Sequence, residues 1–200
     1  NERAVSDFDR RHVFSAVWLY ELPVFRGNPV LGGWSINGLY SANTGEPFTV
    51  TSGVRTSNNT HVSRAILSGA MPDTSLRQAP GVIGPVMFAD NRAFAIPAPG
   101  ENGMGRNMFR SPGFWNLDFG VQKVFALNER FKLQFRAEFF NALNHVNFDN
   151  PGSATDGSNQ ITSATFGRSC CEAVAPSSTQ NIIQTGEAAR VIQFALKLMF

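Results

Sequence analysis

Hydrophobic and polar residues alternate with a period of two along several parts of the chain. In segment 131–140, Phe, Leu or Ala occupies every second position, and Lys, Gln, Arg and Glu stand between them. Successive side chains of a β-strand point to opposite faces, so the pattern predicts a strand with one apolar and one charged face. On a helix, the same charges would surround the cylinder.

Four other segments repeat this alternation. Segment 115–125 and the chain end 192–200 show it clearly, and 12–22 and 34–42 are two further expected strands. Residues 48–51 either extend the second of these or form a short strand. The sequence therefore predicts an all-β fold, and its strands are joined by connections of two very different lengths.

The lengths of the connections favour a particular class of β-protein. Segment 126–130 is a short polar hairpin and segment 23–33 a turn rich in Pro and Gly, whereas 56–112 and 144–187 are long and rich in Gly, Pro, Asn and Ser. We expect the long segments to be structureless loops, which are uncommon in compact soluble domains. Outer-membrane barrels combine short periplasmic turns with long extracellular loops. With the C-terminus in the periplasm, every short connection here lies on the periplasmic side.

The two faces of the predicted strands fit a membrane. Lipid offers no hydrogen bonds, so a spanning sheet closes on itself with an apolar outer face and a polar lumen. We expect the lumen to be lined by Asn116, Asp118, Gln122, Lys132, Gln134, Arg136 and Glu138. Aromatic residues near strand ends are expected to form interfacial girdles, namely Trp18, Tyr20, Trp34, Tyr40 and Trp115. The fold predicted is therefore the C-terminal strands of a transmembrane antiparallel β-barrel with long extracellular loops.

Composition and charge restrict the remaining possibilities. Phe accounts for 18 of the 200 residues, and charged residues make up 16%. No apolar run is long enough for a transmembrane helix. The net charge of +2 is small and its basic residues are scattered, so no nucleic-acid partner is expected. A soluble β-sandwich, with the Phe-rich face as its core, explains the alternation equally well.

Residues that could support catalysis or bind a metal do not form a recognisable set. His12, His61 and His145 lack a second ligand at metal spacing, and His12 and His145 fall at expected strand ends. Cys170 and Cys171 are adjacent, so they cannot join distant segments, and their role stays open. No nucleophile–base pair is evident. We therefore expect no enzyme activity and no cofactor.

Several segments together resemble a known family. They are 6–12 (SDFDRRH), 20–23 (YELP), 31–34 (LGGW), 45–50 (GEPFTV), 105–107 (GRN), 112–118 (PGFWNLD), 133–141 (LQFRAEFFN) and 189–200 (ARVIQFALKLMF). In order and spacing they resemble the late barrel of TonB-dependent transporters of the Oar-like type. The resemblance implies a barrel of about 22 strands around a plug, driven by TonB and the proton-motive force. It also implies that Phe200 belongs to the signal read by the barrel-assembly machinery.

The expected extent of the protein follows from the same comparison. The first residue is not Met, and about five strands cannot close a barrel in lipid. We therefore expect residues 1–200 to be the C-terminal part of a TonB-dependent receptor barrel without its plug and N-terminal domain, through which TonB would bind. Expected partners are outer-membrane lipid and the barrel-assembly machinery, and the substrate stays unknown. The alternatives are a passive porin-like barrel and a secreted β-sandwich binding module.

Overall fold

The computed structural model describes residues 3–25, 27–56, 62–82, 84–152, 157–169 and 189–200. Every regular element in these ranges is a β-strand, so the predicted all-β class is confirmed. The chain divides into two compact units. One contains residues 1–12, 44–114 and 147–173, and the other contains 13–43, 115–146 and 174–200. We call them the loop unit and the sheet unit. Cys170, Cys171 and His61 lie outside the described residues.

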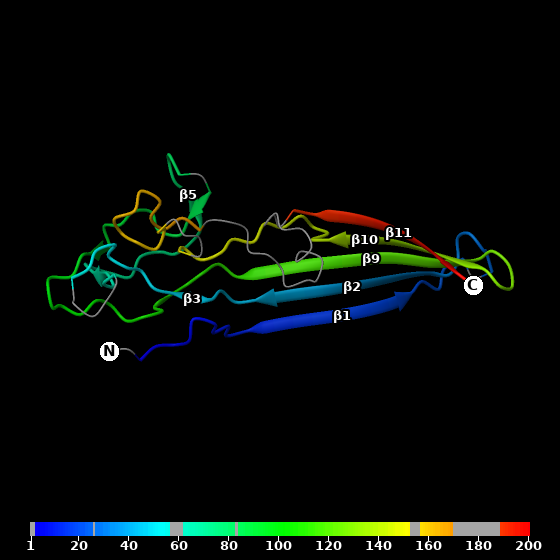
Figure 1. Ribbon diagram of the computed structural model, residues 1–200, viewed down its shortest axis with the longest axis horizontal. Coiled ribbons are helices and arrows are strands. Elements are labelled where there is room, and N and C mark those ends of the chain that lie inside the picture. The colour runs from blue at the N-terminus through cyan, green and yellow to red at the C-terminus, as the bar shows by residue number, and fades with distance from the viewer. Residues whose placement is uncertain (1–2, 26, 57–61, 83, 153–156, 170–188) are drawn as a thin grey trace. The chain divides into compact units, whose positions relative to one another are not determined.

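The sheet unit is an open antiparallel sheet of five strands in the order β1-β2-β9-β10-β11 (Figure 1). Its strands are β1 (Val13–Glu21), β2 (Trp34–Asn43), β9 (Phe114–Ala126), β10 (Lys132–Phe140) and β11 (Val191–Met199). All five predicted strands are present with nearly the predicted bounds. β1 and β11 form the two edges, so these strands do not close a barrel.

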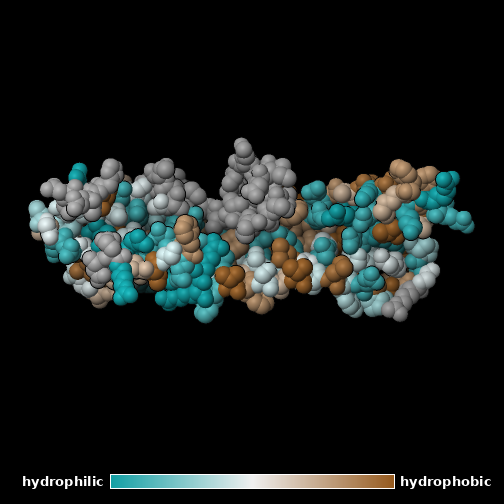
Figure 2. Space-filling view, turned by 60° about the horizontal axis from the view of Figure 1, so that its bottom comes forward, coloured by the Kyte–Doolittle hydropathy of each residue, from teal (hydrophilic) through white to brown (hydrophobic). Residues whose placement is uncertain are grey.

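The strand register places the alternating hydrophobic residues of neighbouring strands on one face. Phe139 lies opposite Phe119 of β9 and Ile192 of β11, and Trp18 of β1 lies opposite Gly38 of β2. Because directly opposed residues share a face, the sheet has one continuous apolar face. Figure 2 shows hydrophobic residues at the molecular surface, and the large side chains on this face include Phe194 and Leu196, which are 68% and 69% exposed.

The short connections of the sheet lie together. Residues 22–33 join β1 to β2, and residues 127–131 join β9 to β10, at the same end of the sheet in Figure 1. The second hairpin is closed by Asn128, whose Oδ1 accepts hydrogen bonds from the backbone N–H groups of Arg130 and Phe131 at 2.9 and 2.7 Å. The long connections leave from the other end, as predicted.

The prediction that the long connections are structureless is wrong for the parts of them that the structure describes. Residues 44–113, between β2 and β9, form three two-stranded ladders within those parts, and residues 157–169 of the connection between β10 and β11 contribute to the same core. The ladders pair β3 (Pro47–Phe48) with β8 (Phe109–Arg110), β4 (Ile66–Leu67) with β7 (Phe94–Ala95), and β5 (Arg77–Gln78) with β6 (Pro85–Val86). Each strand has two residues, which is too short for an alternation to be visible in the sequence.

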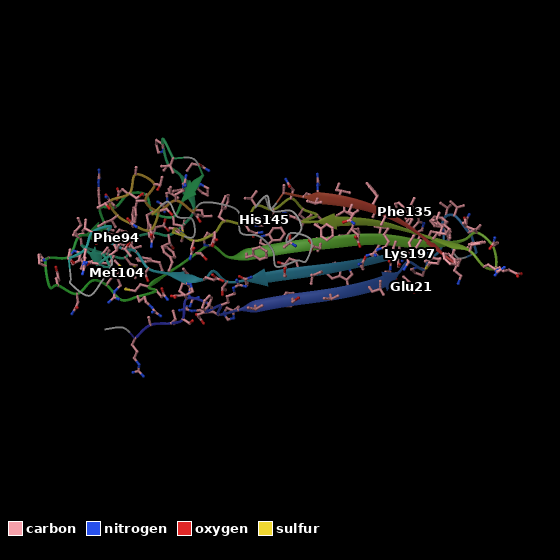
Figure 3. All side chains as sticks on the ribbon, viewed as in Figure 1. Glu21, Phe94, Met104, Phe135, His145 and Lys197 are labelled. Atoms are coloured by element: carbon pink, nitrogen blue, oxygen red, sulfur yellow. The ribbon has the colours of Figure 1, made fainter. Side chains whose placement is uncertain are left out.

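Aromatic rings form the centre of the loop unit. Phe88 is 1% exposed and contacts the rings of Phe94, Phe109 and Phe166, with centroids 5.2, 5.2 and 5.3 Å away. Such edge-to-face and stacked pairs add to the free energy gained by burial. Phe94 and Met104 lie in this same group of side chains (Figure 3).

Backbone hydrogen bonds join the two long connections. The N–H of Ile161 donates to the carbonyl of Thr51 at 3.0 Å, and the N–H of Met87 donates to the carbonyl of Gly167 at 2.8 Å. Gly167 has a φ of 76°, and a Cβ there would come within 3.1 Å of Phe88. The second connection is therefore held directly against the core formed by the first.

Candidate functional site: the two faces of the sheet

The seven residues predicted to line a lumen all lie on the polar face of the sheet. In the register of β9 and β10, Arg136 is opposite Gln122 and Glu138 is opposite Gly120. Arg136 and Glu138 form an ion pair within β10. The side-chain amide of Gln134 donates to that of Gln122 at 3.4 Å, and Lys197 of β11, labelled in Figure 3, lies opposite Gln134. Strand parity alone was sufficient to predict this face.

Asp118 connects the polar face to the end of strand β10. Its Oδ1 accepts hydrogen bonds from the Asn116 side-chain amide at 2.8 Å and from the backbone N–H of Asn141 at 2.9 Å. Asn141 has a φ of 47°, a left-handed conformation that Asn adopts more readily than most residues. Asp118 thus stabilises the turn that ends β10, a structural role that the alternation does not reveal.

A hollow of about 610 Å³ is lined in part by residues of the polar face. Asn37, Asp118 and Glu138 supply polar groups, and Val17 and Leu39 supply apolar ones. Gly120 contributes no side chain here, and the Asn37 amide occupies the space that a Cβ would need. The apolar members were missed, because β1 and β2 each carry hydrophobic residues on both faces.

The predicted girdle aromatics lie on the apolar face in two groups. Trp34, Tyr20 and Trp18 lie towards the end with the short connections, and Tyr40 and Trp115 lie towards the other end, with ring centroids 6.3 Å apart. The ring of Trp18 covers Gly38, and this small residue on the paired strand makes room for it.

His145 has a more specific environment than its expected place at a strand end indicates. Its ring stacks on that of Trp115, with centroids 3.9 Å apart and an angle of 21°. Asn141 holds the segment in place, because its side chain accepts from the His145 N–H and donates to the His145 carbonyl, both at 2.9 Å. The His145 ring therefore covers one side of Trp115 at the border of the apolar face, next to the end of β10.

Lys123 is a charged residue on the apolar face, and the sequence reasoning missed it. It lies opposite Phe135 of β10 and is 3% exposed. Its Nζ donates to the carbonyl oxygens of Val30, at 2.7 Å, and of Gly32. The same atom lies 4.8 Å from the ring centroid of Phe125 and 5.5 Å from that of Trp34. The available signal was a lysine at an apolar position of the 115–125 alternation.

Phe200 follows β11 and is 95% exposed. Among the residues that the structure describes, no three His, Cys, Asp or Glu side chains gather closely enough to hold a metal ion. Within those same ranges, no helix is long and apolar enough to cross a membrane.

Comparison with known proteins gives one match. The family model described as an outer membrane beta barrel domain matches residues 1–191. No curated protein and no solved structure matches the chain. The match agrees with the antiparallel sheet and its two faces, so the protein is placed in the bacterial outer membrane, in contact with lipid. The chain belongs to the outer membrane beta barrel domain family.

Proposed function

We propose that the chain is the C-terminal part of the barrel of a TonB-dependent transporter of the Oar-like type, which takes up a substrate through the outer membrane. The observation that carries the proposal is that segments resembling this family contact one another. Asn107 donates to Asp7, the Arg10 guanidinium donates to Glu46 at 2.9 Å, and Asp118 accepts from Asn141. Each bond joins two of the segments on which the resemblance rests.

The polar face supports a water-filled passage. Its charged groups, including the Arg136–Glu138 pair, would face the lumen, and the hollow beside Gly120 would be open towards it. Lumen-facing residues of outer-membrane barrels are polar and tune passage. In the proposed transporter, an N-terminal part would supply the plug and the contact with TonB, and Phe200 would be read by the barrel-assembly machinery.

Electrical conductance tests the proposal against the passive porin alternative. The native protein that contains this chain would be purified from outer membranes and inserted into planar bilayers. A plugged transporter is expected to conduct no ions until its plug is unfolded with urea, because the plug fills the lumen. Steady channels without urea would refute TonB-dependent transport in favour of a porin.

The gene provides an independent test. Reading the DNA upstream of the codon for Asn1 should reveal further alternating strands, a plug domain and a TonB box in the same frame. A start codon and signal peptide immediately before Asn1 would refute the proposal. That second outcome would leave the outer-membrane family unaffected, because the family match rests on residues 1–191.

A further inference from the structure

The turn between β1 and β2, residues 22–33, carries large apolar side chains that point away from the protein. Phe25 and Val30 are 62% and 63% exposed, and Val24 and Leu31 are exposed as well. The turn contains one charged residue, Arg26, and no acidic residue. The other short connection, residues 127–131, carries the charged pair Glu129 and Arg130 at its centre, between the exposed Leu127 and Phe131.

The backbone of the apolar turn is fixed by its own hydrogen bonds. Asn28 Oδ1 accepts from the N–H groups of Val30 and Leu31, both at 2.9 Å. The N–H of Asn28 donates to the carbonyl of Phe25, and that of Gly32 donates to the carbonyl of Asn28. Phe25 itself has a φ of 54°, a conformation that a bulky residue rarely adopts without a compensating interaction. The exposed side chains are thus presented by a defined loop.

Lys123 fastens this turn to the apolar face of the sheet. Its ammonium lies between the carbonyl oxygens of Val30 and Gly32 and the rings of Trp34 and Phe125. A lysine on a lipid-facing surface is unfavourable unless it finds polar partners. The turn supplies those partners, so keeping Lys123 satisfied requires the turn to stay folded against this face.

These observations specify a partner. The apolar face contacts lipid, and the short connections of outer-membrane barrels lie on the periplasmic side. We infer that the turn 22–33, clamped by Lys123, is an anchor that inserts Phe25, Val30 and their apolar neighbours into the periplasmic phospholipid leaflet. The anchor extends the lipid-facing surface beyond the sheet and does not depend on what the barrel transports.

Fluorescence quenching tests the anchor. In the native protein, after Cys170→Ser and Cys171→Ser, the substitutions Phe25→Cys, Val30→Cys and Glu129→Cys are made one at a time, and each new thiol carries a bimane label. The protein is reconstituted into vesicles of phosphatidylethanolamine and phosphatidylglycerol with brominated acyl chains. We expect labels at 25 and 30 to be quenched by the brominated lipid and shielded several-fold from aqueous iodide, and the label at 129 to show the reverse.

A lysine substitution tests the clamp. Lys123→Met should raise iodide quenching at position 30 towards the value at position 129. Lys132→Met is the matched control, because Lys132 lies at the same end of the sheet on the polar face, and it should leave position 30 shielded.

Two results would overturn the inference. One is iodide quenching at positions 25 and 30 that equals quenching at position 129. The other is iodide quenching of the label at position 30 that stays the same when Lys123→Met is introduced. If that variant does not assemble, the comparison of the three labels with Lys123 intact still decides whether the turn enters lipid.

Discussion

Phe88→Ala is expected to unfold both long connections together, because one aromatic core holds them. Phe88 is fully buried, and its ring lies within 5.3 Å of the Phe94, Phe109 and Phe166 centroids. Truncating a buried Phe to Ala costs about 3–5 kcal/mol. At about 1.4 kcal/mol per factor of ten, the open state of the loop unit should become roughly 10²- to 10⁴-fold more populated.

Hydrogen exchange measures this population segment by segment. The amides of Met87 and Ile161 are the most informative, since their acceptors belong to the other connection. Both should exchange faster in Phe88→Ala, whereas the amides of β9 and β10 should keep their protection. Phe8→Ala is the matched control, because Phe8 is 85% exposed and surface substitutions usually change stability by less than about 0.5 kcal/mol.

The pattern of faster exchange distinguishes one shared core from two connections that fold independently. If exchange in Phe88→Ala becomes faster in residues 85–110 while residues 157–169 stay protected, the two connections fold independently and the single core is refuted. If Phe8→Ala has an equal effect, burial is not the cause.

Three further predictions test single contacts. Gly38→Ala should displace the indole that covers it, cost about 1–3 kcal/mol by overpacking, and shift the tryptophan emission maximum. Asp118→Ala should cost about 1–3 kcal/mol, because it removes an acceptor of the Asn141 N–H, and denaturant titration would measure the loss. Hydrogen bonds from the Ser75 side chain and backbone lower the pKa of Asp73. The protection of the Ser75 amide that these bonds provide should therefore be complete above the ordinary carboxyl pKa, and it should be lost as the pH falls through the lowered pKa of Asp73. The protection factor of the Ser75 amide, which is its exchange rate corrected for the intrinsic effect of pH, would show this loss, and in Asp73→Asn it should not change over the same pH range.

The sheet could be predicted because its signal is geometric. A strand of nine or more residues alternates its side chains between faces, and all five strands of the sheet reach that length. The same parity assigned Gln122, Gln134 and Arg136 to one face. Parity does not reveal contacts between residues distant in sequence, so the Asp118–Asn141 bond and the carbonyl partners of Lys123 required the structure.

The loop unit could not be predicted because its order is tertiary. Its strands have two residues each, and its core residues are spaced irregularly along the chain. Phe48 and Phe109 meet across a two-residue ladder, and Phe88 reaches Phe166 over a long stretch of sequence. Gly, Pro, Asn and Ser predict turns correctly, but turns are compatible with a packed core, and here they build one.

Phenylalanine occupies two different environments in this protein. Phe48, Phe88 and Phe109 of the loop-unit core are buried, as aqueous folding requires, whereas Phe14 and Phe194 on the apolar face of the sheet are exposed. Soluble proteins rarely expose large contiguous apolar patches, and those that occur mark interaction sites. If water surrounded the whole protein, the exposed Phe residues of the sheet would be unexplained, and if lipid did, the buried Phe residues of the loop unit would be. Placing the apolar face in lipid and the loop unit in water satisfies both, because burial in water and contact with acyl chains each remove apolar surface from water.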